Sequence, residues 1–455
     1  MPRLFGTDGV RGLANRDLPA ALALRLGEAA ARHIGGAGAV NHMGPVETKP
    51  VAIVGRDTRI SGQFLDHAVA AGLASAGMDV VRIGVVTTPT VAHLTAAEDE
   101  VALGVMISAS HNPMPDNGIK FFGHGGFKLA DCVEDQIEAL LGKQWDRPTG
   151  AGVGEISTNE DWADQIYINH LVSSIDTSLE GLRIVVDCAN GGASTLGPQA
   201  LREAGAEVVV INASPDGRNI NDRVGSTHPE QLQAATVAAH ADFGVAYDGD
   251  ADRCLAVDHT GAMVDGDKIM GSLALFMRDM GELAEDTLAV TVMSNLGLLL
   301  AMRDNGIKTV QTGVGDRYVL EEMLAHGYTL GGEQSGHVIN RSCATTGDGI
   351  LTSLMLGRMV KKTGRDLAEL TAVVKRLPQT LINVSGVDKL RASSDQGLAE
   401  ALAAAEADLG QTGRILLRPS GTEPLVRVMV EAATQDQADQ VAMRLADVVK
   451  ERLAL

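Results

Sequence analysis

The chain has 455 residues, a net charge of −20 and an apolar content of 45%. A chain of this length exceeds what one hydrophobic core normally supports, so we expect roughly three or four domains of a soluble globular protein. The negative charge disfavours nucleic acid and anionic membranes as partners, and no apolar run approaches the ~18 residues that span a bilayer. Because only 3% of the residues are aromatic, the cores should consist of Ala, Val, Leu and Ile.

The four cysteines, Cys132, Cys188, Cys254 and Cys343, are scattered along the chain without a C-x-x-C spacing. This pattern predicts neither a zinc site nor a set of disulfide bonds. The N-terminal stretch MPRLFGTDGVRG lacks the apolar core of a signal peptide. We therefore expect a reducing, cytoplasmic location.

Three segments repeat one pattern along the chain: a β-branched run, a polar loop, an Ala- and Leu-rich helix and a second β-branched run. They cover residues 51–84, 182–212 and 288–313. Each predicted helix ends at a glycine that suits a left-handed C-terminal cap, namely Gly77, Gly205 and Gly306. The pattern predicts three α/β domains with largely parallel strands. Residues 35–50 show neither the helical nor the strand period of apolar residues and are predicted to form a mobile loop.

The first domain contains the stretch ISASHNPMPDNGIKFFG. Its serine Ser110, expected on a surface loop, could be a nucleophile, a carrier of phosphate or the first polar residue of a turn. Lys120 closes the stretch, and FGTDGVRG supplies Arg11 in a glycine-flanked loop. GRDTRISG supplies Arg56 and Arg59, of which at least one should make a structural salt bridge.

In the second domain, YDGDADR follows the predicted strand ADFGVA. Asp248, Asp250 and Asp252 alternate, so an extended backbone would point all three carboxylates to one side. At ~5–6 Å each pair repels by roughly 3 kcal/mol at an effective dielectric of ~20. A hard divalent cation removes this repulsion, and Mg²⁺ prefers a few carboxylates together with a phosphate oxygen. We interpret the trio as a metal site rather than as a solvated turn.

In the third domain, GGEQSGH places Glu333, Ser335 and His337 alternately after a short strand. A carboxylate and a hydroxyl on one face could bind a pair of sugar hydroxyls, but a polar hairpin explains the pattern equally well. Elsewhere the chain has no Walker A, G-x-G-x-x-G or G-x-S-x-G pattern. Nucleotide-driven kinases, dehydrogenases and α/β-hydrolases therefore lack their usual sequence support.

The C-terminal part has predicted strands in QTLINVSGV and GRILLRPSGTEPLVRVMVEA and an amphipathic helix over 434–455. These elements predict a smaller α+β domain. Its RPSGTEPLVR stretch combines Arg418, Ser420, Thr422 and Arg427 with a tight turn. Guanidiniums, hydroxyls and backbone N–H groups together form a nest for an anion. We interpret the stretch as a phosphate site rather than as a plain hairpin.

Taken together, the motifs resemble those of the α-D-phosphohexomutase superfamily. In the family's order, SASHNP is similar to its phosphoserine loop, DGDADR to its metal loop, GEQSGH to its sugar loop and RPSGTEP to its phosphate loop. The likeness covers essentially the whole chain. It implies an α/β fold of three similar domains with mixed, largely parallel sheets, plus a smaller C-terminal α+β domain, around a central cleft. The expected bounds are 1–163, 164–258, 259–375 and 376–455.

The resemblance also implies a role for each matched residue. Ser110 would carry a phosphoryl group and would share one Mg²⁺ per subunit with the aspartates Asp248, Asp250 and Asp252. The groups expected beside the reacting phosphate are Arg11, Lys120 and, for proton transfer, His337. The sugar contacts would be Glu333 and Ser335. The expected phosphate loop consists of Arg418, Ser420, Gly421, Thr422 and Arg427. The family's metal-loop glycine is Ala251 here, where we expect any small side chain to suffice.

For activity, the resemblance implies conversion of glucosamine 6-phosphate to glucosamine 1-phosphate through a 1,6-bisphosphate, on the path to UDP-N-acetylglucosamine and cell wall. Ser108 and Gln334 are similar to the glucosamine branch, while action on neutral hexose phosphates, as phosphomannomutase/phosphoglucomutase, is the alternative. A non-catalytic sugar-phosphate sensor would be expected to lack the carrier serine or a metal aspartate. Glucosamine or glucose 1,6-bisphosphate would serve as primer, and that bisphosphate or a kinase would phosphorylate Ser110. A homodimer is compatible with this picture.

Overall fold

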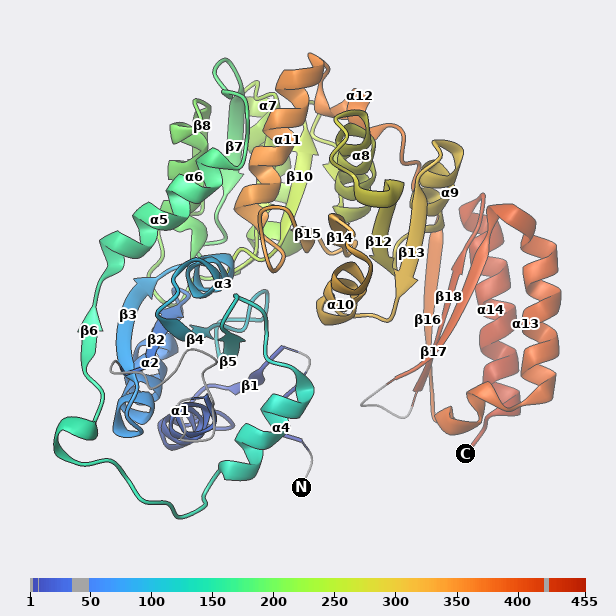
Figure 1. The fold of residues 1–455 in the computed structure, drawn as a ribbon. Helices are drawn as coiled ribbons and strands as arrows, with labels where there is room; N and C mark the ends of the chain where they lie inside the picture. Colours follow the sequence, from blue (N-terminus) through green and yellow to red (C-terminus); the bar gives the residue numbers. More distant parts are fainter. Residues whose placement is uncertain (1–2, 7, 35–48, 421–424) are drawn as a thin grey trace. The chain divides into compact units, whose positions relative to one another are not determined.

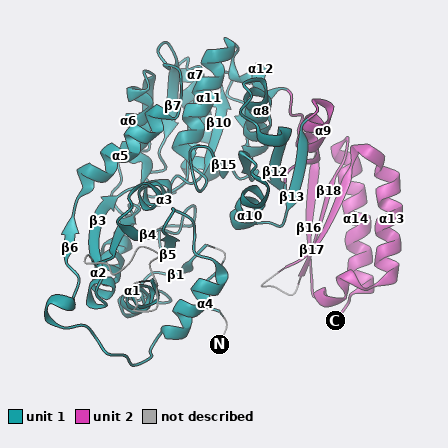
Figure 2. Ribbon diagram, viewed as in Figure 1, with its two compact units in different colours: residues 1–293, 307–372 teal, residues 294–306, 373–455 magenta. Residues whose placement is uncertain are grey.

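The computed structural model describes residues 3–6, 8–34, 49–420 and 425–455. Most of the predicted loop over 35–50 lies outside these residues, as do Gly421 and Thr422 of the predicted phosphate loop. The chain forms two compact units, one of residues 1–293 and 307–372 and one of residues 294–306 and 373–455 (Figure 2). Among the described helices, none combines the length and the apolar character needed to cross a membrane.

The first sheet of the larger unit has six strands, in the order β1 (Val10–Leu13), β5 (Asp116–Gly123), β4 (Val101–Ile107), β2 (Val51–Arg56), β3 (Asp79–Val85) and β6 (Ile156–Thr158) (Figure 1). The helices of this region are α1 (Ala20–Ile34), α2 (Ile60–Ser75), α3 (Thr88–Ala97), α4 (Asp131–Leu140) and α5 (Glu160–Ser173). The core that α1 and α2 share with the sheet is built almost entirely from Ala, Val, Leu and Ile, as the composition predicted.

The second and third sheets have the same kind of layout. The second has the order β11 (Met263–Val264), β10 (Cys254–Asp258), β9 (Phe243–Tyr247), β7 (Arg183–Asp187) and β8 (Glu207–Ile211), with α6 (Ala193–Glu203) and α7 (Glu230–Ala238). The third has the order β13 (Lys308–Thr312), β12 (Thr287–Thr291), β14 (Leu330–Gly332) and β15 (Val338–Asn340). Its region also contains α8 (Gly266–Asp279), α10 (Asp316–His326), α11 (Gly349–Thr363) and α12 (Leu367–Thr371).

The repeat predicted from the sequence is therefore confirmed as a shared topology. The strand orders β3-β2-β4-β5, β8-β7-β9-β10 and β13-β12-β14-β15 are equivalent, with three parallel strands and an antiparallel fourth. The predicted capping glycines Gly77, Gly205 and Gly306 all have positive φ, between +75° and +102°. In each repeat the polar motif follows the third strand, β4, β9 or β14. The three motifs thus leave the carboxyl ends of equivalent parallel strands, where ligands of α/β sheets bind.

The smaller unit contains an antiparallel sheet in the order β16 (Gln379–Ser385), β18 (Leu425–Glu431) and β17 (Arg414–Pro419). Helix α14 (Gln435–Arg452) is the predicted amphipathic helix. Of its predicted apolar stripe, Ala438, Val441, Ala442, Leu445 and Val449 are buried, whereas Val448 is only partly buried. The α+β prediction is confirmed, but sequence analysis did not assign helix α13 (Gln396–Leu409). Helix α9 (Leu296–Asp304), which joins β12 to β13 in the chain, belongs to this unit by its contacts.

Candidate functional site

The predicted carrier serine lies in a turn between β4 and β5. Ser110 is only 1% exposed, so the expectation of a surface loop is wrong. Its hydroxyl donates a hydrogen bond to Asp248 Oδ2 at 2.5 Å, and its backbone N–H donates to Ser108 Oγ at 2.9 Å. The serine loop therefore packs directly against the aspartate loop.

A buried ion pair between Arg59 and Asp57 stabilises the serine loop. The Arg59 guanidinium is fully buried and its Nε lies 2.9 Å from Asp57 Oδ2. Asp57 Oδ2 also accepts a hydrogen bond from Ser108 Oγ at 2.7 Å. The prediction that Arg56 or Arg59 makes a structural salt bridge is confirmed for Arg59. Arg56 Nε lies farther, 3.8 Å, from Asp66 Oδ2.

The three predicted metal ligands come together after β9. One carboxylate oxygen of each of Asp248, Asp250 and Asp252 lies within 4.8 Å of the others, and all three residues are buried. The reason given from the sequence was wrong, because the loop is a turn and not an extended strand. Ala251 has φ +55°, which folds the backbone back and brings Asp252 to the other two. The position therefore favours glycine for its conformation as well as for its size.

The donor set fits a hard cation. Asp250 Oδ1 and Asp252 Oδ1 are buried and have no hydrogen-bond partner among the described residues. Burial, and secondarily the charges of Asp252 and Asp250, raise the pKa of Asp248 to about 8. Buried carboxylates in such a set are costly unless a cation compensates them. Mg²⁺ takes carboxylate oxygens of this kind, so the trio can bind a metal ion.

Lys120 supplies the nearest positive charge. Its buried Nζ lies 2.8 Å from Asp250 Oδ2, 3.1 Å from Asp8 Oδ2 and 3.8 Å from Asp252 Oδ2. Burial alone would lower the pKa of Lys120, but the three carboxylates more than offset it and raise that pKa above its usual range. Arg11 donates to Asp8. The structure therefore brings Lys120 and Arg11 to the aspartate loop through contacts that sequence spacing could not show.

The predicted sugar loop is the turn of the β14–β15 hairpin. Glu333 Oε1 accepts a hydrogen bond from the Gly315 N–H at 3.2 Å, and Ser335 Oγ is buried without a partner among the described residues. His337 is buried, and its Nδ1 lies 3.7 Å from Asp252 Oδ2. Burial alone would lower the pKa of His337, but Asp252 and Asp316 reverse that effect and raise it.

A closed ring of six ionisable side chains, in which carboxylates alternate with Lys120, Lys128 and His337, connects the three loops. Going round it, Lys120 faces Asp8 at 3.1 Å, Asp8 faces Lys128 at 2.5 Å and Lys128 faces Asp316 at 2.6 Å. Asp316 lies 3.6 Å from His337, and His337 lies 3.7 Å from Asp252. Asp252 lies 3.8 Å from Lys120, which closes the ring. Sequence analysis missed Asp8, Lys128 and Asp316. Asp8 lies inside the stretch FGTDGVRG that also contains Arg11, and Asp316 lies in the stretch GVGDRY, which sequence analysis did not assign to the site. Nothing in the sequence marks Lys128.

In the smaller unit, the predicted phosphate loop joins β17 to β18. Arg418 and Arg427 stand directly opposite each other in this antiparallel pair, so their side chains share one face of the sheet. Among the described residues neither guanidinium has a hydrogen bond or an ion pair. The Ser420 carbonyl accepts a hydrogen bond from Lys389 Nζ at 2.5 Å, a cation that sequence analysis missed. Two unpaired guanidiniums on one face can bind an anion.

Family models match four successive parts of the chain. They are the α/β/α domains I, II and III and the C-terminal domain of phosphoglucomutase/phosphomannomutase, over residues 2–146, 165–261, 265–377 and 381–448. The chain belongs to this family. The predicted membership of the α-D-phosphohexomutase superfamily and the predicted fold class are thereby confirmed.

Curated relatives of this mutase family are similar over their whole length. The phosphoglucosamine mutases of Bifidobacterium animalis subsp. lactis and Streptomyces coelicolor are 61% and 60% identical to this chain, and the similarity covers 100% of each chain. Among solved structures, a phosphoglucomutase/phosphomannomutase family protein from Burkholderia thailandensis has a TM-score of 0.82 at 24% identity, covering 100% of this chain and 99% of that one. An Aspergillus fumigatus N-acetylphosphoglucosamine mutase in complex with GlcNAc-6P and magnesium has a TM-score of 0.69 at 18% identity, covering 99% and 96%.

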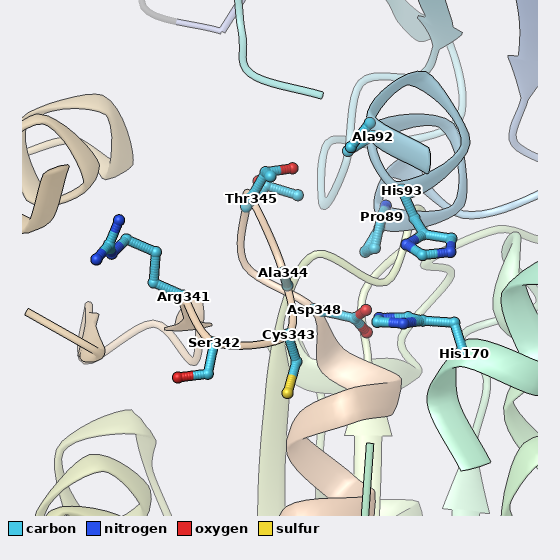
Figure 3. A pocket seen from close by; sticks show the side chains of 12 residues that line it. Pro89, Ala92, His93, His170, Arg341, Ser342, Cys343, Ala344, Thr345 and Asp348 are labelled. Carbon is cyan, nitrogen blue, oxygen red and sulfur yellow. The ribbon is translucent and has the colours of Figure 1, made fainter. Parts of the chain in front are cut away.

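A separate cavity of about 220 Å³ in the larger unit contains none of the predicted site residues. Figure 3 shows the rings of His93 and His170 stacked beside it, with centroids 3.9 Å apart. Burial, and then the neighbouring His170, lower the pKa of His93 to about 4, so this ring is neutral at pH 7. The wall formed by Cys343, Thr345 and their neighbours belongs to the connection from β15 to α11. The cavity is therefore distinct from the aspartate loop of the mutase.

Proposed function

We propose that this phosphohexomutase interconverts glucosamine 6-phosphate and glucosamine 1-phosphate, as its full-length relatives named phosphoglucosamine mutase suggest. The observation that carries the proposal at the level of the site is the contact of Ser110 Oγ with Asp248, 2.5 Å away. It joins a potential carrier hydroxyl to a buried trio of carboxylates. His111 Nδ1 also lies 3.4 Å from this hydroxyl, but an acyl-transfer serine would need an oxyanion site as well as a base.

We assign the phosphoryl group to Ser110. In the first half of the cycle the bond from Oγ to phosphorus breaks while a bond forms from phosphorus to the open hydroxyl of the hexosamine monophosphate. The product of that half is a 1,6-bisphosphate, which turns end for end and returns its other phosphoryl group to Ser110. Phosphoryl transfer of this kind depends on positioning and on neutralisation of charge. Arg11 and Lys120, which meet at Asp8, are the cations that we assign to the transferring phosphate.

The residues that would hold one Mg²⁺ per subunit are Asp248, Asp250 and Asp252, together with an oxygen of phosphoserine 110. When bound, this ion would neutralise charge on the phosphoryl oxygens. In support, Asp250 and Asp252 each have one buried carboxylate oxygen without a hydrogen-bond partner among the described residues. The similar Aspergillus fumigatus N-acetylphosphoglucosamine mutase was solved in complex with magnesium, which is consistent with this assignment.

We assign the sugar hydroxyls to Glu333 and Ser335 and the transfer of the hydroxyl proton to His337. Support for these roles comes from the buried, unpartnered Ser335 Oγ and from the linkage of His337 to Asp252 and Asp316. The phosphate that does not react would be held by the C-terminal loop, whose residues are Arg418, Ser420, Gly421, Thr422 and Arg427.

The same proposal covers the priming of Ser110, the location and assembly of the enzyme, and its domain bounds. A glucosamine or glucose 1,6-bisphosphate, or a kinase, would place the first phosphate on Ser110. The enzyme would act in the cytoplasm on a small hexosamine phosphate, for UDP-N-acetylglucosamine and peptidoglycan synthesis, and it could do so as a homodimer. We retain the four-domain division at 1–163, 164–258, 259–375 and 376–455 as a proposal.

The experiment that tests the substrate is a side-by-side determination of kcat/KM for the 6-phosphates of glucosamine, glucose and mannose. The proposal expects the highest value for glucosamine 6-phosphate. A higher value for glucose or mannose phosphate would favour the phosphomannomutase/phosphoglucomutase alternative, while absence of turnover on all three in the presence of bisphosphate and Mg²⁺ would favour a sensor.

A further inference from the structure

The backbone of the serine loop is held in a conformation that a serine rarely adopts. Ser110 has φ +52°, in the left-handed region where most side chains other than glycine are strained. Residues kept in such regions need surroundings that fix them. The direction of Ser110 Oγ depends on this φ, so the groups that fix the backbone also fix the hydroxyl that faces Asp248.

Two backbone carbonyl groups of the loop are each held by the same two side chains. The Ser110 carbonyl oxygen accepts hydrogen bonds from Arg59 Nη2 at 2.9 Å and from Asn221 Nδ2 at 2.8 Å. The Asn112 carbonyl oxygen accepts from Arg59 Nη2 at 2.8 Å and from Asn221 Nδ2 at 3.1 Å. A carbonyl oxygen has two lone pairs, and here both carbonyls use them for this pair of donors.

The two donors come from different parts of the larger unit. Arg59 precedes α2 beside the first sheet, and its guanidinium is already fixed by Asp57. Asn221 lies in the connection from β8 to α7 of the second sheet. Asn221 is itself in the left-handed region, with φ +57°, and its N–H donates to the Ala189 carbonyl at 3.0 Å. Asparagine tolerates that backbone conformation better than most residues.

The metal loop packs on the same spot. A Cβ added to Gly249 would lie 2.6 Å from the Ser110 carbonyl oxygen and 3.0 Å from Asn221 Nδ2. Only glycine therefore allows the aspartate loop to approach the fixed carbonyl and the asparagine amide together. Asn221 thus lies where the serine loop, the metal loop and the second sheet meet.

We propose that Asn221 is a positioning residue for phosphoryl transfer, which holds the Ser110 and Asn112 carbonyls against Arg59 and so keeps Ser110 Oγ directed at the aspartates. This inference rests on the proposed function of Ser110 as the phosphate carrier. Asn221 acts through the backbone of the serine loop, so its loss should lower kcat and leave the KM for sugar phosphate nearly unchanged.

The test compares the kcat and KM of two Asn221 variants with those of one variant of a neighbouring residue. Asn221→Gly keeps the backbone conformation and removes the amide, and it should lower kcat about five- to twentyfold, which corresponds to one or two hydrogen bonds, with KM within about threefold. Asn221→Asp keeps the size but turns an oxygen toward two carbonyl oxygens, and it should lose about tenfold more. The control is Asn219→Ala, because the Asn219 amide donates to the Ser214 carbonyl of the same connection and, within the described part of the chain, makes no hydrogen bond to the serine loop.

Two results would overturn the inference. One is an Asn221→Gly enzyme with a kcat within twofold of the wild-type value. The other is a loss of kcat in Asn219→Ala as large as in Asn221→Gly, since the order of the connection and not the amide would then matter. The kcat of Ser110→Ala is measured in parallel, because it distinguishes a failure of the proposed function from a failure of the role of Asn221. If Ser110→Ala keeps its activity, the proposed function fails; if it is inactive and Asn221→Gly is normal, only the role of Asn221 fails.

Discussion

Replacing Lys128 by methionine should destabilise the larger unit by about 3–5 kcal/mol, the usual cost of removing one partner from a buried ion pair. The Lys128 ammonium lies 2.5 Å from Asp8 and 2.6 Å from Asp316, and its side chain is only 11% exposed. Asp8 would still have Lys120 and Arg11 as partners. Among the described residues Asp316 would keep only His337, at 3.6 Å, so the uncompensated charge on Asp316 should account for most of the loss.

The assay is urea unfolding of Lys128→Met, Asp316→Asn and the double variant. Adding Asp316→Asn to Lys128→Met removes the uncompensated carboxylate, so the double variant should recover at least about 1.5 kcal/mol. A matched control is Lys362→Met. Lys362 Nζ lies 3.1 Å from Asp176, but the two side chains are 33% and 53% exposed, so the control should lose at most about 1 kcal/mol.

The difference between wild type and Lys128→Met should also depend on pH. Burial alone would raise the pKa of Asp8, but Lys120, Lys128 and Arg11 hold it well below its usual range. The stability from such a carboxylate is present above its ordinary pKa and is lost as the pH falls through the lower, folded value. Against the same effect of burial, Lys128 and His337 lower the pKa of Asp316. The difference should therefore be present at pH 7 and shrink in acid, as Asp8 and Asp316 become protonated. A difference below 1 kcal/mol at pH 7, or one that persists unchanged at low pH, would refute the reasoning.

Three further predictions concern the metal loop and the phosphate loop. Ala251→Gly should stabilise the protein by up to about 1 kcal/mol, because it relieves a left-handed alanine, and a lower melting temperature would contradict this. Arg427→Ala should raise KM for both monophosphate isomers by a similar factor, for a loss of about 1.5–3 kcal/mol, whereas unchanged KM values would mean that the guanidinium does not bind substrate. Because the pKa of Asp248 is raised to about 8, protonation stabilises the metal-free protein at low pH and this contribution is lost as the pH rises through that value. Mg²⁺ must displace the proton, so its thermal shift should grow between pH 6.5 and 8.5, and a shift independent of pH, or unaltered in Asp248→Asn, would contradict the assignment.

Sequence analysis predicted the parts of the site that are written in short, contiguous motifs. Ser110 and the aspartates were found because each motif follows a strand and contains residue types with distinctive chemistry. Asp8, Lys128 and Asp316 belong to one charge ring, but they are far apart in the chain, and no local pattern indicates which charges will pair. Asn221 was missed for the same reason.

The sequence patterns also did not predict the local backbone conformation of these loops. The spacing of Asp248, Asp250 and Asp252 gave the correct grouping through an incorrect extended strand, because the left-handed φ of Ala251 arises from the packing of the loop. Likewise, the turn residues around Ser110 suggested an exposed loop, whereas contacts with Arg59 and the second sheet bury it. The three repeats and their glycine caps follow local rules and were predicted more successfully.

Whether Ser110 carries the phosphate can be determined by mass spectrometry of the protein after one turnover. The enzyme is incubated with glucose 1,6-bisphosphate and Mg²⁺, digested, and its phosphopeptides are sequenced before and after a chase with glucosamine 6-phosphate. We expect phosphate on Ser110 alone, its loss during the chase at a rate no slower than kcat, and no activity in Ser110→Ala. Phosphate on Ser108, or turnover in the Ser110→Ala enzyme within tenfold of wild type, would contradict this assignment.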